Sequence, residues 1–160
     1  MAEMIMELAL AGLREKGRAD AQALAVLSVA GEADGTYLIA HEKEIPTWRQ
    51  RDFSCEDTPI GKPYQWNGQI YKLWQQHDAT NQPGWSPDLA VSLWDICHTK
   101  DPKQAKEYQA PQGTRGLWQS AECCVFNGHL WKCLTDNQAY SPMELPDGWE
   151  DLGPVSEVQA

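Results

Sequence analysis

Cysteine and histidine are the residues of this chain best suited to bind a metal ion. Cys123, Cys124, His129 and Cys133 lie close together in the sequence, but no Cys-x2-Cys spacing of the kind found in zinc sites is present. Neighbouring residues of a strand also point to opposite faces, which separates Cys123 from Cys124. The sequence therefore predicts no metal site and no cofactor.

Two pairs of neighbouring residues have types that occur in catalysis. Cys97 and His98 would need to reach each other as nucleophile and base, yet adjacent strand residues face opposite ways and no third residue marks an orienting partner. Glu150 and Asp151 would need to face each other across a cleft to cleave a glycosidic bond. No glycine-rich phosphate loop is present. We expect a non-enzymatic protein and keep a small hydrolase as a weaker alternative, which a pocket containing a carboxyl group of raised pKa would support.

Tryptophan is unusually frequent, with 8 Trp against 2 Phe. Trp buries a large surface, so a chain rich in it either builds its core from Trp or presents flat aromatic surfaces. Trp85 and Tyr140 each stand directly before a Ser-Pro pair, in a turn, where side chains often carry function. These two are candidates for an exposed platform. The aromatic residues that we expect in the core are Tyr64, Tyr71, Trp94, Trp131 and Trp149.

The last two thirds of the chain contain an internal repeat. Residues 67–73 (Asn-Gly-Gln-Ile-Tyr-Lys-Leu) return 60 positions later as residues 127–133 (Asn-Gly-His-Leu-Trp-Lys-Cys). The Trp-Ser-Pro of residues 85–87 returns as Tyr-Ser-Pro in residues 140–142, and in both copies a Trp follows nine residues after that aromatic residue. Because Asn-Gly between alternating runs is typical of a two-residue hairpin turn, we predict one β-hairpin in each copy.

The first 31 residues have a helical period instead. Residues 3–31 predict a helical hairpin whose first helix ends near Gly17, and whose second helix is capped by Asp20 and ends at Gly31. Such short helices need a surface to pack on. They either cap their own domain or dock on another chain, and the apolar stripe available for a partner consists of Met4, Ile5, Leu8 and Leu13.

These patterns divide the chain into five parts. The predicted parts are a helical N-terminal segment for anchoring or oligomerisation (1–45), a first β module (46–97), a linker (98–116), a second β module (117–152) and a loosely ordered tail (153–160). The expected fold is mainly β with an α-helical N-terminal segment, and its two small β modules stand in tandem.

The repeated motifs resemble a known family. The order of Asn-Gly, Tyr, Trp-x-Pro and final Trp resembles the small chitin-binding type carbohydrate-binding modules of families 5 and 12, and resembles more closely their variants in small bacteriophage and prophage tail or virion proteins. The quoted matches are Tyr71-Lys72, Gln76-His77, residues 83–88 and Trp94 in the first copy, and residues 140–142, Pro146 and residues 148–150 in the second.

The sequence departs from the family at three points. The family's Gly-Asp pair is Gly61-Lys62 in the first copy and Ala121-Glu122 in the second. The opening aromatic residue is Trp118 in the second copy but Thr58 in the first, and the family's paired Trp is reduced to Trp74 and Leu134.

The resemblance implies a non-enzymatic structural or attachment protein of a bacteriophage virion, associated with its tail or capsid, with carbohydrate-binding-module-like repeats. The alternative is a polysaccharide-binding accessory protein that recognises chitin-like or cell-wall glycans. Sugar C–H faces pack on flat aromatic rings beside hydrogen-bonding side chains. The candidate carbohydrate-binding residues are Trp74, Trp85, Tyr140, Gln76 and Asn81.

Charge and composition set the expected partners and location. The 23 acidic and 13 basic residues give a net charge of −10, which disfavours nucleic acid. No apolar run is long enough to span a bilayer, and no signal peptide is expected. Five Cys, an odd number, exclude a complete disulfide framework. We therefore expect synthesis in the host cytoplasm and assembly into the virion, with other virion proteins, further copies of this chain and a host surface glycan as partners.

Overall fold

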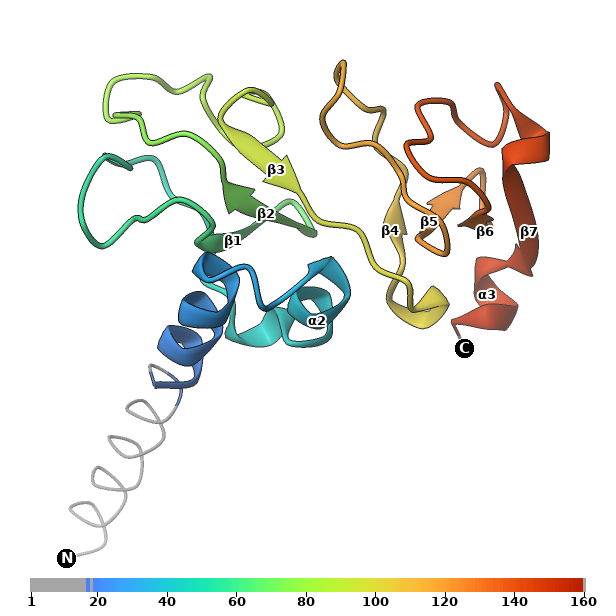
Figure 1. The fold of residues 1–160 in the computed structure, drawn as a ribbon, viewed down its shortest axis with the longest axis horizontal. Helices are drawn as coiled ribbons and strands as arrows, with labels where there is room; N and C mark the ends of the chain where they lie inside the picture. The colour runs from blue at the N-terminus through green and yellow to red at the C-terminus, as the bar shows by residue number, and fades with distance from the viewer. Residues whose placement is uncertain (1–16, 18, 160) are drawn as a thin grey trace, which may run out of the picture.

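The computed structural model describes residues 17 and 19–159, and it places two small sheets side by side (Figure 1). The first sheet has the order β1-β2-β3 and the second the order β4-β5-β6-β7. The strands of the first sheet are β1 (Pro63–Trp66), β2 (Gln69–Leu73) and β3 (Trp94–Ile96). Those of the second are β4 (Lys106–Glu107), β5 (Cys123–Phe126), β6 (His129–Cys133) and β7 (Trp149–Pro154).

Most of the short helices lie along one side of the two sheets, at the bottom of Figure 1, whereas the turn of residues 146–148 lies at the upper end of β7. Residues 19–29 are helical. The other helical elements are α2 (Gly35–Ala40), α3 (Val155–Val158) and the 3-10 turns η1 (Glu42–Glu44), η2 (Pro102–Gln104) and η3 (Pro146–Gly148). The chain is thus rich in β structure with a helical N-terminal part, as predicted. Among the described residues, no helix has the length and apolarity needed to cross a bilayer.

Both predicted hairpins are confirmed. Asn67 and Gly68 have φ values of 49° and 77°, and Asn127 and Gly128 have 51° and 76°, as a two-residue primed turn requires. In the second copy Phe126 pairs with His129, as a two-residue turn at Asn127 and Gly128 requires.

A third strand completes each hairpin at an equivalent place. Leu73 pairs with Trp94 in the first sheet, and Cys133 pairs with Trp149 in the second. The two copies therefore share one register from the turn to the final Trp.

The equivalence of the two copies begins earlier than the sequence indicated. The amide of Trp48 donates to the Gln65 carbonyl at 2.8 Å, and the amide of Tyr108 donates to the Val125 carbonyl at 2.9 Å. Gln65 and Val125 occupy the same register position, so Tyr108 in the second copy takes the place of Trp48.

The segment 98–116, for which we expected a linker, therefore supplies part of the second sheet. Its strand β4 pairs in parallel with β5 at the sheet edge. The Tyr108 ring packs against the buried cluster of Trp118 and Trp149. The physical reason is that this aromatic ring adds to a core that is otherwise too small.

The C-terminal residues 153–159 also differ from the loose tail that we expected. They finish β7 and form α3, where Val155 and Val158 pack against the buried Leu130. Gly153 has a φ of 106° beside a register shift in β6, so the chain bends there and the helix returns to the sheet. Two valines three positions apart provide the apolar contact.

The aromatic cores follow the prediction closely. Tyr64, Tyr71, Trp94 and Trp149 are buried, and Trp131 is half-buried against the second core. The two faces of each hairpin pack against different apolar clusters, because successive strand residues point to opposite faces. Ile70 accordingly reaches the opposite face and packs with the helical segment.

Phe53 fills the position for which the sequence suggested Thr58. Phe53 and His77 exchange backbone hydrogen bonds, as Trp118 and Gln138 do in the second copy. The Phe53 ring also meets Trp94 edge to face at 5.2 Å, and the Trp118 ring meets Trp149 at 5.7 Å. Both modules thus contain the opening aromatic residue, displaced in the first copy by a longer loop.

The helix through residues 19–29 ends at Gly31 as predicted. The amide of Gly31 donates to Ser28 at 3.1 Å and that of Glu32 donates to Leu27 at 2.9 Å, which is the Schellman pattern, and Gly31 adopts a φ of 76°. The predicted cap at Asp20 is wrong, because Gly17 and Ala19 are already helical. The stripe of Met4, Ile5, Leu8 and Leu13 lies outside the described residues.

The helical segment is fixed to the first module by close contacts. Leu24, Leu38 and Ile39 are buried in one cluster with Ile70. A Cβ placed on Gly35 would lie 2.2 Å from the His98 carbonyl oxygen, so only glycine permits this approach of α2 to the strand end.

Candidate functional site

Trp85 stands at a turn in the loop between β2 and β3, with 38% of its side chain exposed. Its amide donates to Gln82 at 3.2 Å, and the Ser86 hydroxyl donates to Asp88 at 2.5 Å, so the turn is held on both sides of the ring. The ring meets His77 edge to face at 6.0 Å. This local network presents the indole at the surface.

A shallow pocket of 430 Å³ adjoins Trp85. Gln75, His77 and Ser92 provide its polar groups, and Leu89 and Leu93 are among its apolar ones. Nδ1 of His77 lies 2.8 Å from the Gln75 carbonyl, whereas its buried Nε2 has no hydrogen-bond partner among the described residues. A flat aromatic ring beside polar side chains suits a neutral polar ligand with C–H faces.

Tyr140 occupies the same position in the second module and is more exposed, at 56%. Its amide donates to Gln138 Oε1 and its carbonyl accepts from Trp149 Nε1, both at 3.0 Å. Met143 and Leu145 are exposed beside it in the same loop. Tyr140 therefore lies in a loop that exposes three large apolar side chains.

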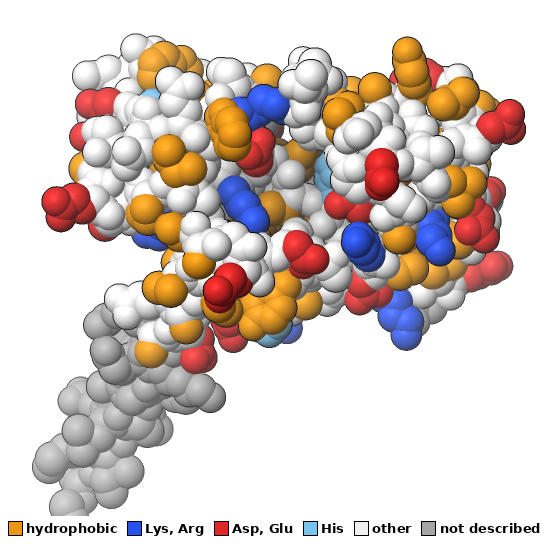
Figure 2. Space-filling view, in the orientation of Figure 1, with side chains coloured by type: hydrophobic (Ala, Val, Ile, Leu, Met, Phe, Trp, Pro, Cys, Tyr) orange, Lys and Arg blue, Asp and Glu red, His pale blue; other side chains and the backbone are white. Residues whose placement is uncertain are grey.

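The loops that contain the two exposed aromatic residues lie on the same side of the molecule. They run along the top of Figure 1, away from α2 and α3. Figure 2 shows apolar side chains along this upper rim in both halves. Each module therefore contributes to this side a loop that contains an exposed aromatic residue.

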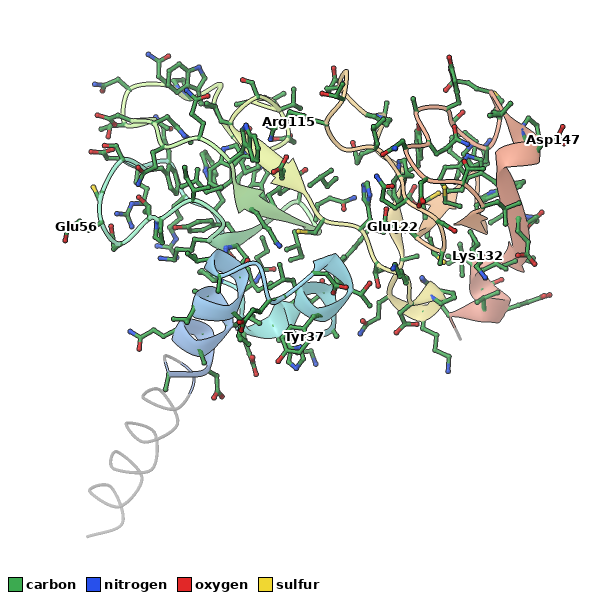
Figure 3. All side chains as sticks on the ribbon, in the orientation of Figure 1. Tyr37, Glu56, Arg115, Glu122, Lys132 and Asp147 are labelled. Atoms are coloured by element: carbon green, nitrogen blue, oxygen red, sulfur yellow. The ribbon has the colours of Figure 1, made fainter. Side chains whose placement is uncertain are left out.

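Trp74 is exposed but does not join Trp85. It lines a separate cleft of 460 Å³ between the two modules, and the Arg115 guanidinium lies over its ring with Cζ 4.4 Å from the centroid. Figure 3 shows Arg115 between the two sheets. One face of the Trp74 ring is therefore occupied by the second module.

The two polar candidates also lie apart from Trp85. Nε2 of Gln76 donates to the carbonyls of Cys55 and Thr58, at 3.3 and 3.0 Å, and so fastens the loop before β1. Asn81 is exposed and does not line the pocket of Trp85. Gln75 and His77 line it instead. Sequence reasoning gave no binding role to His77, although it directly follows the candidate Gln76 in the sequence.

The residues that we considered for catalysis have pKa shifts that disfavour a catalytic role. Burial raises the pKa of Cys97 and of Cys124 to about 12, which disfavours a nucleophilic thiolate. Hydrogen bonds from His129 and Gly153 lower the pKa of Asp151, the opposite of what a glycosidase acid needs. Within residues 17 and 19–159, no cluster of three His, Cys, Asp or Glu side chains could hold a metal ion.

Asp95 is the carboxyl group closest to the description of a hydrolase acid. Burial raises its pKa, and it lines the cleft that Trp74 shares. The Arg115 guanidinium pairs with it and opposes that rise, however, so the pair serves as a contact between the modules.

The comparisons with known proteins provide no further guide to this surface. No protein-family model matches the chain, and no curated protein is significantly similar to it.

Proposed function

We propose that this chain is a non-enzymatic attachment protein of a bacteriophage virion, and that its two β modules bind glycans through Trp85 and Tyr140. The observation that carries the proposal is that equivalent turns of the two modules each leave one aromatic ring exposed, in loops that lie on the same side of the molecule. The other repeated aromatic residues build the cores, so these two are surplus to folding.

The chemistry of the two positions suits sugars. A pyranose presents a face of C–H groups that packs on an indole or phenol ring, while its hydroxyls need nearby donors and acceptors. Gln75 and Ser92 provide such groups beside Trp85. Such binding does not depend on charge and is compatible with a net charge of −10.

Two weak sites on one rigid body add through avidity. When one module is bound, the second meets a long polysaccharide at a high effective concentration. A virion that carries many copies multiplies this effect. Weak single sites are therefore sufficient for attachment to a host surface.

The experiment is a titration of chitin-type and cell-wall oligosaccharides and of the corresponding polymers, followed by Trp fluorescence and calorimetry. We expect Trp85→Ala and Tyr140→Ala each to weaken polymer binding about 10-fold and the double variant to abolish it. Tyr37→Ala is the matched control, because Tyr37 is an exposed aromatic residue on α2, at the opposite side of the molecule (Figure 3).

The outcomes separate the alternatives. No binding across a broad panel would contradict the glycan role and leave a structural adaptor. Binding without incorporation into purified phage particles, measured by mass spectrometry, would favour a polysaccharide-binding accessory protein. Release of shorter sugars, lost in Asp95→Asn, would favour the hydrolase.

A further inference from the structure

A wide apolar groove separates the helix of residues 19–29 from the first module. It encloses 770 Å³, and its surface is mostly apolar. The helix contributes Leu24, Val26 and Val29, and the module side contributes Ile45, Pro59 and Pro63. Apolar side chains are visible where the helix meets the first module in Figure 2. Val26 is 68% exposed, which is an unusual state for a valine on a groove wall.

The sequence contains an apolar stripe outside the described residues. Met4, Ile5, Leu8 and Leu13 recur at helical spacing, and a helix of ten residues is about 15 Å long. Small alanines on the groove helix leave room for larger side chains from such a stripe. The apolar character of the stripe therefore matches that of the groove.

One charge pairing is available to the stripe. The groove lining includes Lys62 beside the acidic Glu44 and Asp57, and Glu7 is the charged residue within residues 4–13. Burial lowers the pKa of Lys62, so an acidic group of a docked segment would stabilise its ammonium form.

The geometry favours a stripe from another copy. Gly17, Ala19 and Asp20 are helical, and the described helix points with its N-terminal end away from the two sheets (Figure 1). The stripe of the same copy would reach the groove only if the chain reversed within the three residues between Leu13 and Gly17. A stripe from a second copy needs no such reversal.

We propose that this groove receives the apolar stripe of residues 4–13 from a second copy of the chain, and that two copies exchange these stripes reciprocally. Such an exchange is isologous, so it closes into a dimer with two-fold symmetry. This inference goes beyond the glycan role, and its test uses no glycan.

The test measures the mass of the full-length chain by light scattering over concentrations from about 1 to 100 μM. We expect a concentration-dependent dimer. Val26→Asp places a carboxylate in the groove and should weaken the dimer about 100-fold. Leu8→Asp should do the same from the stripe side. Met143→Asp, at a residue 70% exposed in the second module, is the matched control and should leave the dimer unchanged.

Mixing the two variants distinguishes a contact between groove and stripe from a dimer contact elsewhere on the chain. The Val26→Asp copy keeps an intact stripe and the Leu8→Asp copy keeps an intact groove, so the mixture regains one of the two contacts. We expect a heterodimer where each variant alone is monomeric.

Several results would overturn the proposal. A wild-type monomer throughout the range would do so, as would a dimer that Val26→Asp leaves intact. An equal loss in Met143→Asp, or no heterodimer on mixing, would place the contact elsewhere. Circular dichroism on each variant confirms that loss of the dimer is not loss of the fold.

Discussion

Arg115 lies over the ring of Trp74, and this contact joins the two modules. The guanidinium comes from the loop before β5, whereas the indole directly follows β2. The same guanidinium pairs with Asp95 and donates to the Trp94 carbonyl at 3.2 Å. A second link is the side chain of Gln69, which donates to the Glu107 carbonyl at 3.1 Å. These contacts set the spacing between Trp85 and Tyr140.

We expect Arg115→Ala to lower the free energy of unfolding by about 1–2 kcal/mol, since it removes a half-buried ion pair and a cation–π contact and leaves Asp95 without its partner. Urea denaturation measures this. Arg51→Ala is the matched control, because Arg51 pairs with Asp57 on the exposed surface of one module and should cost less than about 0.5 kcal/mol.

Adding Asp95→Asn to Arg115→Ala should restore part of the loss. Burial already raises the pKa of Asp95, and an amide avoids the cost of a half-buried unpaired charge. A double variant that is less stable than Arg115→Ala would show that Arg115 acts through packing alone.

The two hairpin turns give a prediction about glycine. Gly68→Ala and Gly128→Ala should each cost about 1 kcal/mol, because both glycines have a positive φ near 77° and an added Cβ would be strained although it meets no neighbour. Gly84→Ala is the matched control. Gly84 also has open space around it but no positive φ, and its substitution should be neutral. Equal losses at all three positions would contradict the turn assignment.

The sequence predicted these hairpins because their signal is local. Asn-Gly with alternating flanks specifies a turn, a register and two faces at once, and the 60-residue repeat then carried the assignment from one copy to the other. The end of the helix at Gly31 was predicted from an equally local signal, because a glycine commonly follows the last turn of a helix.

The parts that sequence reasoning missed depend on distant contacts. Tyr108 lies among polar residues, and only its backbone bond to Val125 shows that it opens the second module. Phe53 takes the place predicted for Thr58 because a loop length changed, which spacing alone cannot reveal. Trp74 and Trp85 were both candidates for carbohydrate binding. Trp74 instead lies under Arg115, which comes from the other module, in the cleft between the modules.

The five cysteines should differ sharply in reactivity. Cys97, Cys123, Cys124 and Cys133 are buried, and burial raises the pKa of each, to about 12 for Cys97 and about 11 for Cys123. Cys55 is partly exposed. At pH 8 a disulfide reagent should therefore react quickly with one thiol, and with the others only after denaturation. Cys55→Ser should abolish the fast phase. A fast phase that survives in this variant would mean that one of the buried thiols becomes accessible in the native protein.

Stability should fall at alkaline pH. Burial raises the pKa of Tyr64, Tyr71 and Tyr108 from 10.0 to about 12, and that of Cys97 from 9.0 to about 12. The unfolded chain therefore loses these protons first. Between pH 9 and 12 the folded state binds more protons, so the free energy of unfolding decreases as the pH rises. Urea midpoints should be constant with respect to these groups below pH 9 and decline above it.

Tyr64→Phe with Tyr108→Phe isolates the phenol part of this effect. Both hydroxyls are buried without a hydrogen-bond partner among the described residues, so their removal should leave stability at pH 7 unchanged or slightly higher. The double variant should also lose less stability than the wild type between pH 10 and 12, since two of the groups that bind protons more tightly in the folded state are gone. Tyr140→Phe, at an exposed position, should show the wild-type decline. If the double variant declined as steeply as the wild type, the buried thiols would carry the alkaline loss, and Cys97→Ala would then be the variant that flattens it.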